Sequence, residues 1–399
     1  MNKSLSTINV NRILRTIWEQ EPISRIDIAR SLDLSKSTIT LIVAQLIERG
    51  MVVEKTIGNT SLAGGRKPVG LGINPDYGVL IGIEFQTDLA RVVAVSLDGS
   101  ILLREQETLD FDSTDVSVLL ERTIERYKER LENAGHRVIG AALGIAGIID
   151  PRQRCIRRSN PLAIEEPVQI DHAMDERLGI PIFLENDSKC CCWADLASHR
   201  AVKPQHFMYV LGELRKLNIA NREVRGLAVG MAFVIDGKVH YGHNYTSGEF
   251  SSIFKRDTDV TQFSIHESKE VALGVSDPER RQAVFEELAD NIALVANLLN
   301  LRTVGFAGDI VQFRDELTPT LEDAIQRNWS YPDQAEVDIA YTPFGAWAVA
   351  YGAAAVVIEQ LFALPKVTEE EGQSLPVGIG LFDLVDTVAE TARSGASAS

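Results

Sequence analysis

Small polar and basic side chains gather near the N-terminus, where a stretch of helical periodicity begins. Residues 35–40 read Ser-Lys-Ser-Thr-Ile-Thr. Lys36, Ser37 and Thr40 project away from the apolar side of the helix that they begin. Lysine neutralises phosphates, hydroxyls hydrogen-bond to phosphate oxygens or base edges, and this turn carries no acid. The chemistry fits contact with the major groove of DNA; the alternative is a helical hairpin buried in a core.

A helix-turn-helix would position these side chains. Ser24 is the expected N-cap of a first helix, with Asp27 as its capping-box partner, and Ser35 is the expected N-cap of the second. A short turn joins the two helices, and the second begins with small polar residues, as in DNA-binding helix-turn-helix units. Strands at 52–57 and 69–73 can then pair as a hairpin, which predicts a winged version.

The wing would have a basic tip. Residues 63–68 read Ala-Gly-Gly-Arg-Lys-Pro, so that glycines precede a basic pair and a proline. Such an extended tip can lay Arg66 in a minor groove, whereas the alternative is a flexible charged loop. The predicted DNA contacts are Arg25, Lys36, Ser37, Thr38, Thr40, Arg66 and Lys67, of which Thr38 lies at the edge of the polar side.

The distribution of charge agrees with a DNA-binding unit on an acidic body. The chain of 399 residues has a formal net charge of −16, which taken whole argues against nucleic acid. Residues 1–72 carry 10 Lys+Arg and 6 Asp+Glu, a net charge of +4, and the remainder carries −20. A basic N-terminal unit therefore precedes acidic domains, which the phosphates of DNA would repel.

Cysteine use and hydropathy predict a cytoplasmic protein. The cysteines are Cys155 and the run 190–192, with no CxxC pair, and no secretory signal starts the chain. Three consecutive thiols on a helix point in different directions, so reduced, buried thiols are expected rather than a metal site. The longest uncharged apolar run, 344–358, has 15 residues and is too short to cross a bilayer.

Beyond residue 74 strands alternate with helices, which predicts an α/β fold. Asp-Gly hairpin turns at 98–99 and 236–237 occupy corresponding places in the two halves, which predicts two related lobes around a cleft. The expected strands are 79–85, 89–97, 101–109, 138–149, 182–185, 207–211, 227–235 and 303–306, and the expected helices are 115–134, 278–300 and 344–362. The expected domains are a winged helix at 1–73, a first lobe at 74–187, a second lobe at 188–393 and a disordered tail at 394–399.

These segments together resemble the ROK family of repressors, open reading frames and sugar kinases. The resemblance covers nearly the whole length and rests on SRIDIARSLDLSKSTIT, GGRKP, GIAGIIDP, LENDS, GLAVGMAFVIDGKVHYG and SGEF. It implies an actin-like body, of the sugar kinase and ribonuclease H-like ATPase type, that binds sugars between its lobes. Members with an added winged helix are mostly transcriptional repressors of sugar genes.

The resemblance also implies which residues contact a sugar. Asn160, Asn186, Asp187 and Glu249 follow strands at the places where the family has its sugar contacts. Amide and carboxylate groups suit this task because each sugar hydroxyl both donates and accepts a hydrogen bond. In the kinases of the family, the Asp that matches Asp187 takes the proton from the attacking hydroxyl. The alternative for Asn186 and Asp187 is a pair that caps a helix.

Three departures from the phosphate-binding segments of the family argue against kinase activity. An Asp-Gly-Thr segment after the first strand is replaced at 84–87 by Glu-Phe-Gln-Thr, which lacks the glycine that lets backbone approach phosphate. A Gly-Thr-Gly-Ile-Gly segment reads Gly-Leu-Ala-Val-Gly at 226–230, and a charged segment at about 213–225 reads as an insertion before it. The glycine pair on the adenosine side has become Ala307-Gly308. We therefore expect no catalytic residues and no cofactor.

The zinc site that the family carries is also missing from the sequence. Its Glu-x-Gly-His motif reads Glu-Phe-Ser-Ser from Glu249, and no cysteine follows Cys192. Since both the histidine and the thiolates are gone, we expect no metal. The missing histidine also contacts sugar in the family, so the ligand of this chain can differ or bind more weakly.

These observations predict a DNA-binding transcriptional regulator, most readily a repressor of carbohydrate-utilisation genes. We expect it to bind palindromic double-stranded operator DNA as a homodimer or homotetramer and to respond to a sugar or sugar derivative. One alternative is a sugar kinase with a tethered DNA-binding unit. The other is a ligand-independent regulator whose lobes serve only to dimerise it.

Overall fold

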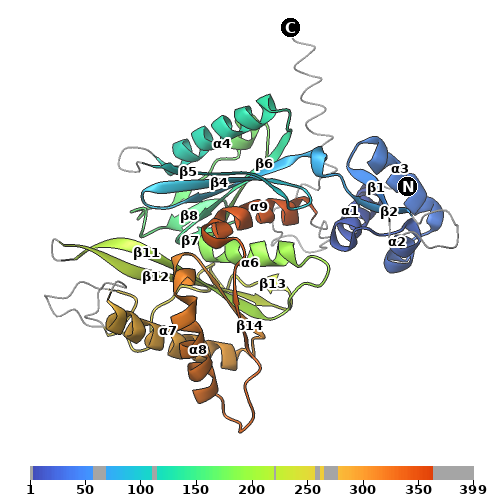
Figure 1. The fold of residues 1–399 in the computed structure, drawn as a ribbon. Helices are drawn as coiled ribbons and strands as arrows, with labels where there is room; N and C mark the ends of the chain where they lie inside the picture. Colours follow the sequence, from blue (N-terminus) through green and yellow to red (C-terminus); the bar gives the residue numbers. More distant parts are fainter. Residues whose placement is uncertain are drawn as a thin grey trace.

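The structure is a computed structural model that describes residues 3–56, 69–109, 115–219, 222–256, 261–264 and 277–362. It has a small N-terminal unit beside a larger body of two lobes (Figure 1). The predicted wing tip at 63–68 and the predicted tail at 394–399 lie outside the described residues.

The N-terminal unit is the predicted winged helix-turn-helix. Ser24 and Ser35 are the N-caps of its second and third helices, because their Oγ atoms accept the N–H of Asp27 at 3.2 Å and of Thr38 at 3.1 Å. The two strands pair antiparallel along their whole length, which confirms the predicted hairpin. The elements are α1 (Lys3–Gln20), α2 (Arg25–Leu32), α3 (Lys36–Glu48), β1 (Val52–Thr56) and β2 (Val69–Ile73).

The first lobe is built on a five-stranded sheet with the order β10-β6-β3-β4-β5. β3 is parallel to β6 and antiparallel to β4, and β10 is parallel to β6. β3 and β6 are buried along their whole length, as expected for apolar strands covered on both faces. The strands are β3 (Val79–Phe85), β4 (Leu89–Ser96), β5 (Ile101–Thr108), β6 (Val138–Ile145) and β10 (Ile182–Asn186).

The strand expected at 138–149 is interrupted. β6 ends at Ile145, and the chain turns at Gly147, whose φ of +128° favours glycine. A Cβ at Gly147 would also lie 2.2 Å from the carbonyl oxygen of Arg158, so the turn needs a residue without a side chain. A small antiparallel sheet follows, consisting of β7 (Ile148–Asp150), β8 (Cys155–Arg158) and β9 (Val168–Gln169).

The second lobe repeats the topology of the first, as the two Asp-Gly turns predicted. Its sheet has the order β13-β12-β11-β14-β15, with β11 antiparallel to β12 and parallel to β14. In the segment interpreted as an insertion, residues 213–219 extend β11 and residues 222–225 extend β12, and the two extensions pair antiparallel. The strands are β11 (Phe207–Ile219), β12 (Arg222–Ile235), β13 (Lys238–Val239), β14 (Thr303–Ala307) and β15 (Asp338–Tyr341).

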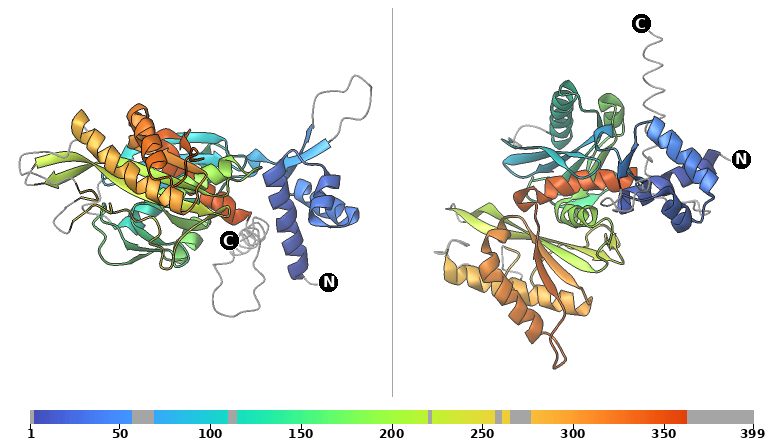
Figure 2. Two further views of the ribbon diagram at one scale, coloured as in Figure 1. Left: turned by 90° about the horizontal axis from the view of Figure 1, so that it is seen from below. Right: turned by 45° about the vertical axis from the view of Figure 1, so that its right-hand side comes forward.

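Helices cover both sheets on both faces and form the layer between the lobes (Figures 1 and 2). α9 packs on the sheet of the first lobe, α6 packs on that of the second, and the two helices pack on each other. The two helices approach closely at Gly352 of α9. A side chain would not fit there, because its Cβ would lie 1.9 Å from the carbonyl oxygen of Cys190. The helices are α4 (Val116–Asn133), α5 (Ala173–Leu178), α6 (Asp187–Ser198), α7 (Pro278–Leu298), α8 (Arg314–Arg327) and α9 (Ala348–Leu361), with 3-10 turns η1 (Pro75–Tyr77), η2 (Asp309–Phe313) and η3 (Gly345–Trp347).

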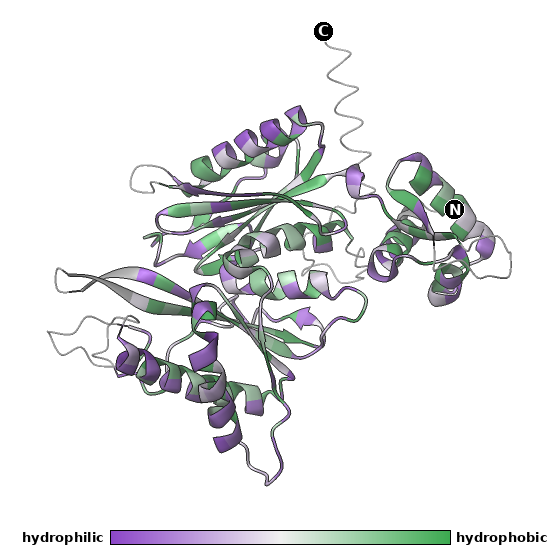
Figure 3. Cartoon of the chain, viewed as in Figure 1, coloured by the Kyte–Doolittle hydropathy of each residue, from purple (hydrophilic) through white to green (hydrophobic). Residues whose placement is uncertain are grey.

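The outer helices are amphipathic, with their hydrophilic sides turned away from the sheets (Figure 3). α4 buries Leu120, Ile124 and Tyr127 against the first sheet, and α7 and α8 bury Leu288 and Leu321 against the second. The helical spacing of these apolar residues explains why the segments form helices at the surface.

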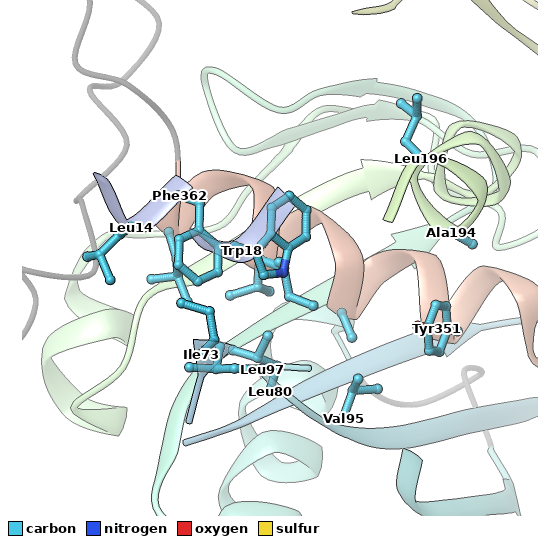
Figure 4. Packing of buried hydrophobic residues seen from close by; sticks show 14 of the residues in the cluster. Leu14, Trp18, Ile73, Leu80, Val95, Leu97, Ala194, Leu196, Tyr351 and Phe362 are labelled. Carbon is cyan, nitrogen blue, oxygen red and sulfur yellow. The ribbon is translucent and has the colours of Figure 1, made fainter. Parts of the chain in front are cut away.

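The winged helix and the body share one hydrophobic core. The rings of Trp18 on α1 and Phe362, directly after α9, stack with centroids 5.2 Å apart. Figure 4 shows these rings next to Leu14 and Ile73 of the winged helix and Leu97 of the first lobe. The N-terminal unit is therefore fixed on the body through side-chain packing, in addition to the chain connection at residue 74.

Candidate functional site

The outward side of α3 carries most of the predicted DNA contacts. Lys36, Ser37 and Thr40 are exposed, while Thr38 is half-buried. The hydroxyls are partly engaged within the helix itself, because Thr40 donates to the carbonyl of Lys36 at 2.7 Å and Ser37 lies 2.8 Å from the hydroxyl of Ser35. Thr38 belongs to the cap, with its N–H and its hydroxyl both bonded to Ser35.

The remaining predicted DNA contacts have different surroundings. Arg25, at the start of α2, forms an ion pair with Glu54 of β1 at 2.9 Å, with both side chains partly exposed. That pair joins α2 to the wing and would have to open before Arg25 met a phosphate. Arg66 and Lys67 lie outside the described residues.

A small pocket opens between the two lobes. The first lobe contributes the end of β3 and the loop after it, and the second contributes β11 and the start of α6. This arrangement brings residues far apart in sequence to one place at the carboxyl ends of parallel strands, where α/β folds bind ligands. The pocket is lined by Glu84, Phe85, Gln86, Thr87, Ala146, Pro161, Asp187, Glu213 and Arg215.

A network of carboxylates and one amide joins the lobes at this pocket. The Nε2 of Gln86 donates to Glu84 and to Glu213, each at 2.6 Å, and so connects β3 with β11. Arg91 pairs with Glu84, and Arg215 pairs with Glu213, each at 3.1 Å. Burial raises the pKa of Glu84, and burial together with the charge of Glu84 raises the pKa of Glu213 to about 8. The network therefore holds protons that exposed carboxyls would release.

Asn186 and Asp187 stand at the junction of β10 and α6. Asn186 is the N-cap of α6, because its Oδ1 accepts the N–H of Lys189 at 3.1 Å and the hydroxyl of Ser188 at 2.6 Å. Its Nδ2 donates to the carbonyl of Gly147 at 3.0 Å. The capping alternative therefore holds for Asn186, whose amide is engaged on both sides.

Asp187 faces the pocket. Its Oδ2 lies 3.9 Å from the guanidinium of Arg215, and burial raises the pKa of its carboxyl. Its Oδ1 accepts the N–H of Ser188 at 2.7 Å, and the residue lines the space between the lobes. Of the four predicted sugar contacts, this is the one that lines the pocket.

Glu249 and Asn160 lie further out. Glu249 follows Gly248, where a Cβ would lie 1.8 Å from the carbonyl oxygen of Met231, so the loop crosses directly over β12. The pKa of Glu249 is raised, first by the partial burial of its carboxyl and then by the charge of Asp187, although much of the residue is open to solvent. Asn160 is exposed beside Pro161, which itself lines the pocket.

The pocket residues that sequence reasoning missed include Gln86, Glu213 and Arg215. The sequence did contain a signal for these residues. Residues 84–87 and the charged segment after Leu211 are where the chain departs from the phosphate-binding segments of the ROK family. Charge alone could not show that the two segments meet, because Gln86 and Glu213 are 127 positions apart.

The described residues include neither a cluster of metal ligands nor a membrane-spanning helix. No group of three or more His, Cys, Asp or Glu side chains in the described ranges could hold a metal ion. The helices that the structure describes include none long and apolar enough to span a membrane. All four cysteines are free and buried.

Comparison with known proteins agrees with this geometry. Residues 80–258 match the ROK family, and residues 7–55 match the MarR family. The chain is similar to the xylose repressor of Caldicellulosiruptor bescii, with 26% identity over 61% of this chain and 58% of that protein. It is similar to the N-acetylglucosamine repressor of Escherichia coli O6:H1, with 25% identity over 62% of this chain and 57% of that protein. The matched region thus spans less than two thirds of these curated relatives.

The fold has a counterpart along nearly its whole length. The crystal structure of a ROK family transcriptional regulator, a homologue of the E. coli MLC protein, superposes with a TM-score of 0.72 at 20% identity. The superposition covers 96% of this chain and 100% of that one. Residues 80–258 therefore belong to a ROK family domain, which follows an N-terminal winged helix that matches the MarR family at residues 7–55.

Proposed function

We propose that this chain is a sugar-responsive, DNA-binding transcriptional regulator that represses carbohydrate-utilisation genes and has no kinase activity. The proteins to which it is similar include a xylose repressor and an N-acetylglucosamine repressor. The winged helix supplies a capped helix with an exposed lysine and hydroxyls, which suits the major groove. The body supplies polar side chains around a pocket of about 10 Å³ between the lobes; these side chains suit a hydroxyl-rich ligand, and the lobes must part to admit one.

The observation that carries the proposal is a direct connection between the pocket and the winged helix through α6. The helix begins at Asp187 in the pocket, and Arg200, just after its end, donates to Glu21 at 2.6 Å. The side chain of Glu21 is 7% exposed and also accepts from Lys55 of β1 at 3.0 Å and from the N–H of Ile73 of β2 at 2.8 Å. A sugar that moves the start of α6 would therefore shift both strands of the wing.

The surroundings of the expected phosphate positions support the absence of kinase activity. Phe85 and Gln86 put bulky side chains in the first expected phosphate segment, and the amide of Gln86 is already bonded to Glu84 and Glu213. Gly230, the last residue of the second expected phosphate segment, is part of β12 and packs against Ser188 of α6.

We further propose that the protein acts as a homodimer or homotetramer on a palindromic operator. Half-sites about one helical turn apart would match two winged helices related by a two-fold axis. A sugar that changes their spacing would weaken operator binding by a coupling free energy of about 1–3 kcal/mol, which is about 5-fold to 150-fold in affinity.

The test begins with selection of an operator from random double-stranded DNA by the full-length protein. Operator affinity is then measured with and without D-xylose, D-glucose, N-acetylglucosamine and ATP, and sugar-dependent ATP hydrolysis is assayed in parallel. We expect one sugar to weaken operator binding and ATP to have no effect. Turnover of ATP would favour the tethered kinase. Direct binding of a sugar that leaves operator affinity unchanged would contradict the coupling, and no response to any ligand would favour a regulator that needs none.

A further inference from the structure

The outward side of α3 carries an aliphatic residue at its centre. Leu41 is 63% exposed, although the other large apolar residues of the helix face inward. A single exposed leucine is common on protein surfaces and indicates nothing by itself. Leu41 is of interest because of its position on α3.

Helical spacing places Leu41 in the middle of the side that would enter DNA. Ser37 lies one turn before it and Ala44 nearly one turn after it, and both are exposed. In Figures 1 and 2, α1 lies between α3 and the body, so the outward side of α3 is clear of both lobes. The helix carries no acid before Glu48, so its first two turns and its positive N-terminus can approach phosphates.

The hydroxyls that precede Leu41 are not fully available for reading bases. Thr40 donates to the carbonyl of Lys36, and Ser37 shares a hydrogen bond with the capping residue Ser35. The aliphatic surface of Leu41 and Ala44 is therefore a larger part of the surface that α3 would present to the bases in the major groove. In the major groove, the apolar feature that a leucine can contact is the C5-methyl group of thymine.

We propose that Leu41, supported by Ala44, determines part of the operator specificity by packing on thymine methyl groups in the major groove. This inference rests on the proposed DNA-binding function and adds to it the base type that the helix reads. Side chains that only contact phosphates would give no such preference.

The test removes single methyl groups from the DNA. In the selected operator, each dT is replaced in turn by dU, which pairs identically and lacks only the methyl. For the wild-type protein we expect affinity to fall about fourfold at one or two positions in each half-site, the effect of exposing one methylene-sized group. Leu41→Ala should bind the normal operator more weakly and should no longer respond to dU at those same positions.

A matched control is Leu298→Ala. Leu298 is 74% exposed at the end of α7 in the body, so its loss should change neither affinity nor the dU response. Since Leu41 is exposed, Leu41→Ala should keep the wild-type circular dichroism and unfolding temperature. The inference is overturned if wild-type protein is indifferent to dU at every position, or if Leu41→Ala responds at the same positions as wild type. Failure to select any operator would instead overturn the proposed function and this inference with it.

Discussion

Asp187 is the predicted sugar contact with the strongest position in the pocket. Its carboxylate lines the space between the lobes near Arg215, whereas the amide of Asn186 is used in capping α6. Asp187→Asn should lower sugar affinity at least ~10-fold, because the amide loses the negative charge and replaces one of the two acceptor oxygens with a donor, and should leave operator affinity unchanged. Isothermal titration with the active sugar and gel-shift titration measure the two effects.

The control for that variant is a carboxylate far from the pocket. Asp290 on α7 forms a surface ion pair with Arg327, so Asp290→Asn should change neither titration. If Asp187→Asn bound sugar as tightly as wild type, the assignment of this residue would be wrong.

Glu213 should make the stability of the protein depend on pH. Burial and the charge of Glu84 raise its pKa to about 8 in the folded state, against 4.5 for an ordinary glutamate. Because the folded protein holds this proton more tightly than the unfolded chain does, its stabilising effect is full below about pH 4.5 and is lost as the pH rises through about 8. The unfolding temperature of wild type should therefore fall between about pH 5 and pH 8.5.

Glu213→Gln isolates this contribution from those of the other buried carboxyls. Its amide carries no titratable proton, so the unfolding temperature of the variant should fall less over the same pH range, with a difference of up to a few kcal/mol in the free energy of unfolding. Parallel pH profiles for the two proteins would show that Glu213 does not hold a proton in the folded state.

At the level of single elements, local signals predicted the structure well where capping and periodicity agreed. α3 was predicted because Ser35 precedes a run whose apolar residues recur at helical spacing, and those residues are buried. α8 was not among the predicted helices, and it forms around Pro319, which is a helix-breaking signal. Tertiary packing of Leu317 and Leu321 into the second core outweighs that local cost.

The pocket was less predictable than the elements that build it. The end of β10 and the start of α6 could be found in sequence, and with them Asn186 and Asp187. The sequence could not show whether each of these side chains would cap the helix or face the pocket. That depends on how neighbouring parts of the chain, such as the turn at Gly147, are arranged around them. The connection of Gln86 to Glu213 similarly depends on how the long β11–β12 hairpin meets the first lobe.

α6 is the element on which coupling between sugar and DNA should depend. Arg200→Gln removes the ion pair with Glu21 at the far end of α6, while the bonds of Glu21 to Lys55 and Ile73 remain. We expect sugar affinity to be unchanged and the effect of sugar on operator affinity to fall by at least half in free energy. Gel-shift titration with and without sugar measures this effect.

The control for this variant is an arginine whose ion pair lies elsewhere. Arg177 on α5 pairs with Glu121 of α4 on the surface of the first lobe, so Arg177→Gln should leave the sugar effect intact. A wild-type response in Arg200→Gln would mean that the signal reaches the winged helix by another contact.

For the whole molecule, the shared core predicts that the winged helix and the body unfold together. Trp18 is buried where α1 meets the body, stacked on Phe362 and flanked by Arg200 and Lys203, whose cations lie within 6 Å of its ring. Wild type should therefore give one calorimetric transition, because neither part can lose its structure without exposing this contact.

Trp18→Ala tests that prediction directly. Removing a buried tryptophan costs about 3–5 kcal/mol, and here the cost falls on the contact between the two parts. We expect a separate, lower transition for the winged helix and a body transition close to that of wild type. Phe285→Ala, which opens a cavity inside the second lobe, should lower the body transition without dividing the trace. Two transitions in the wild type would show that the parts are already independent, and α6 would then have no rigid partner through which a sugar could move the wing.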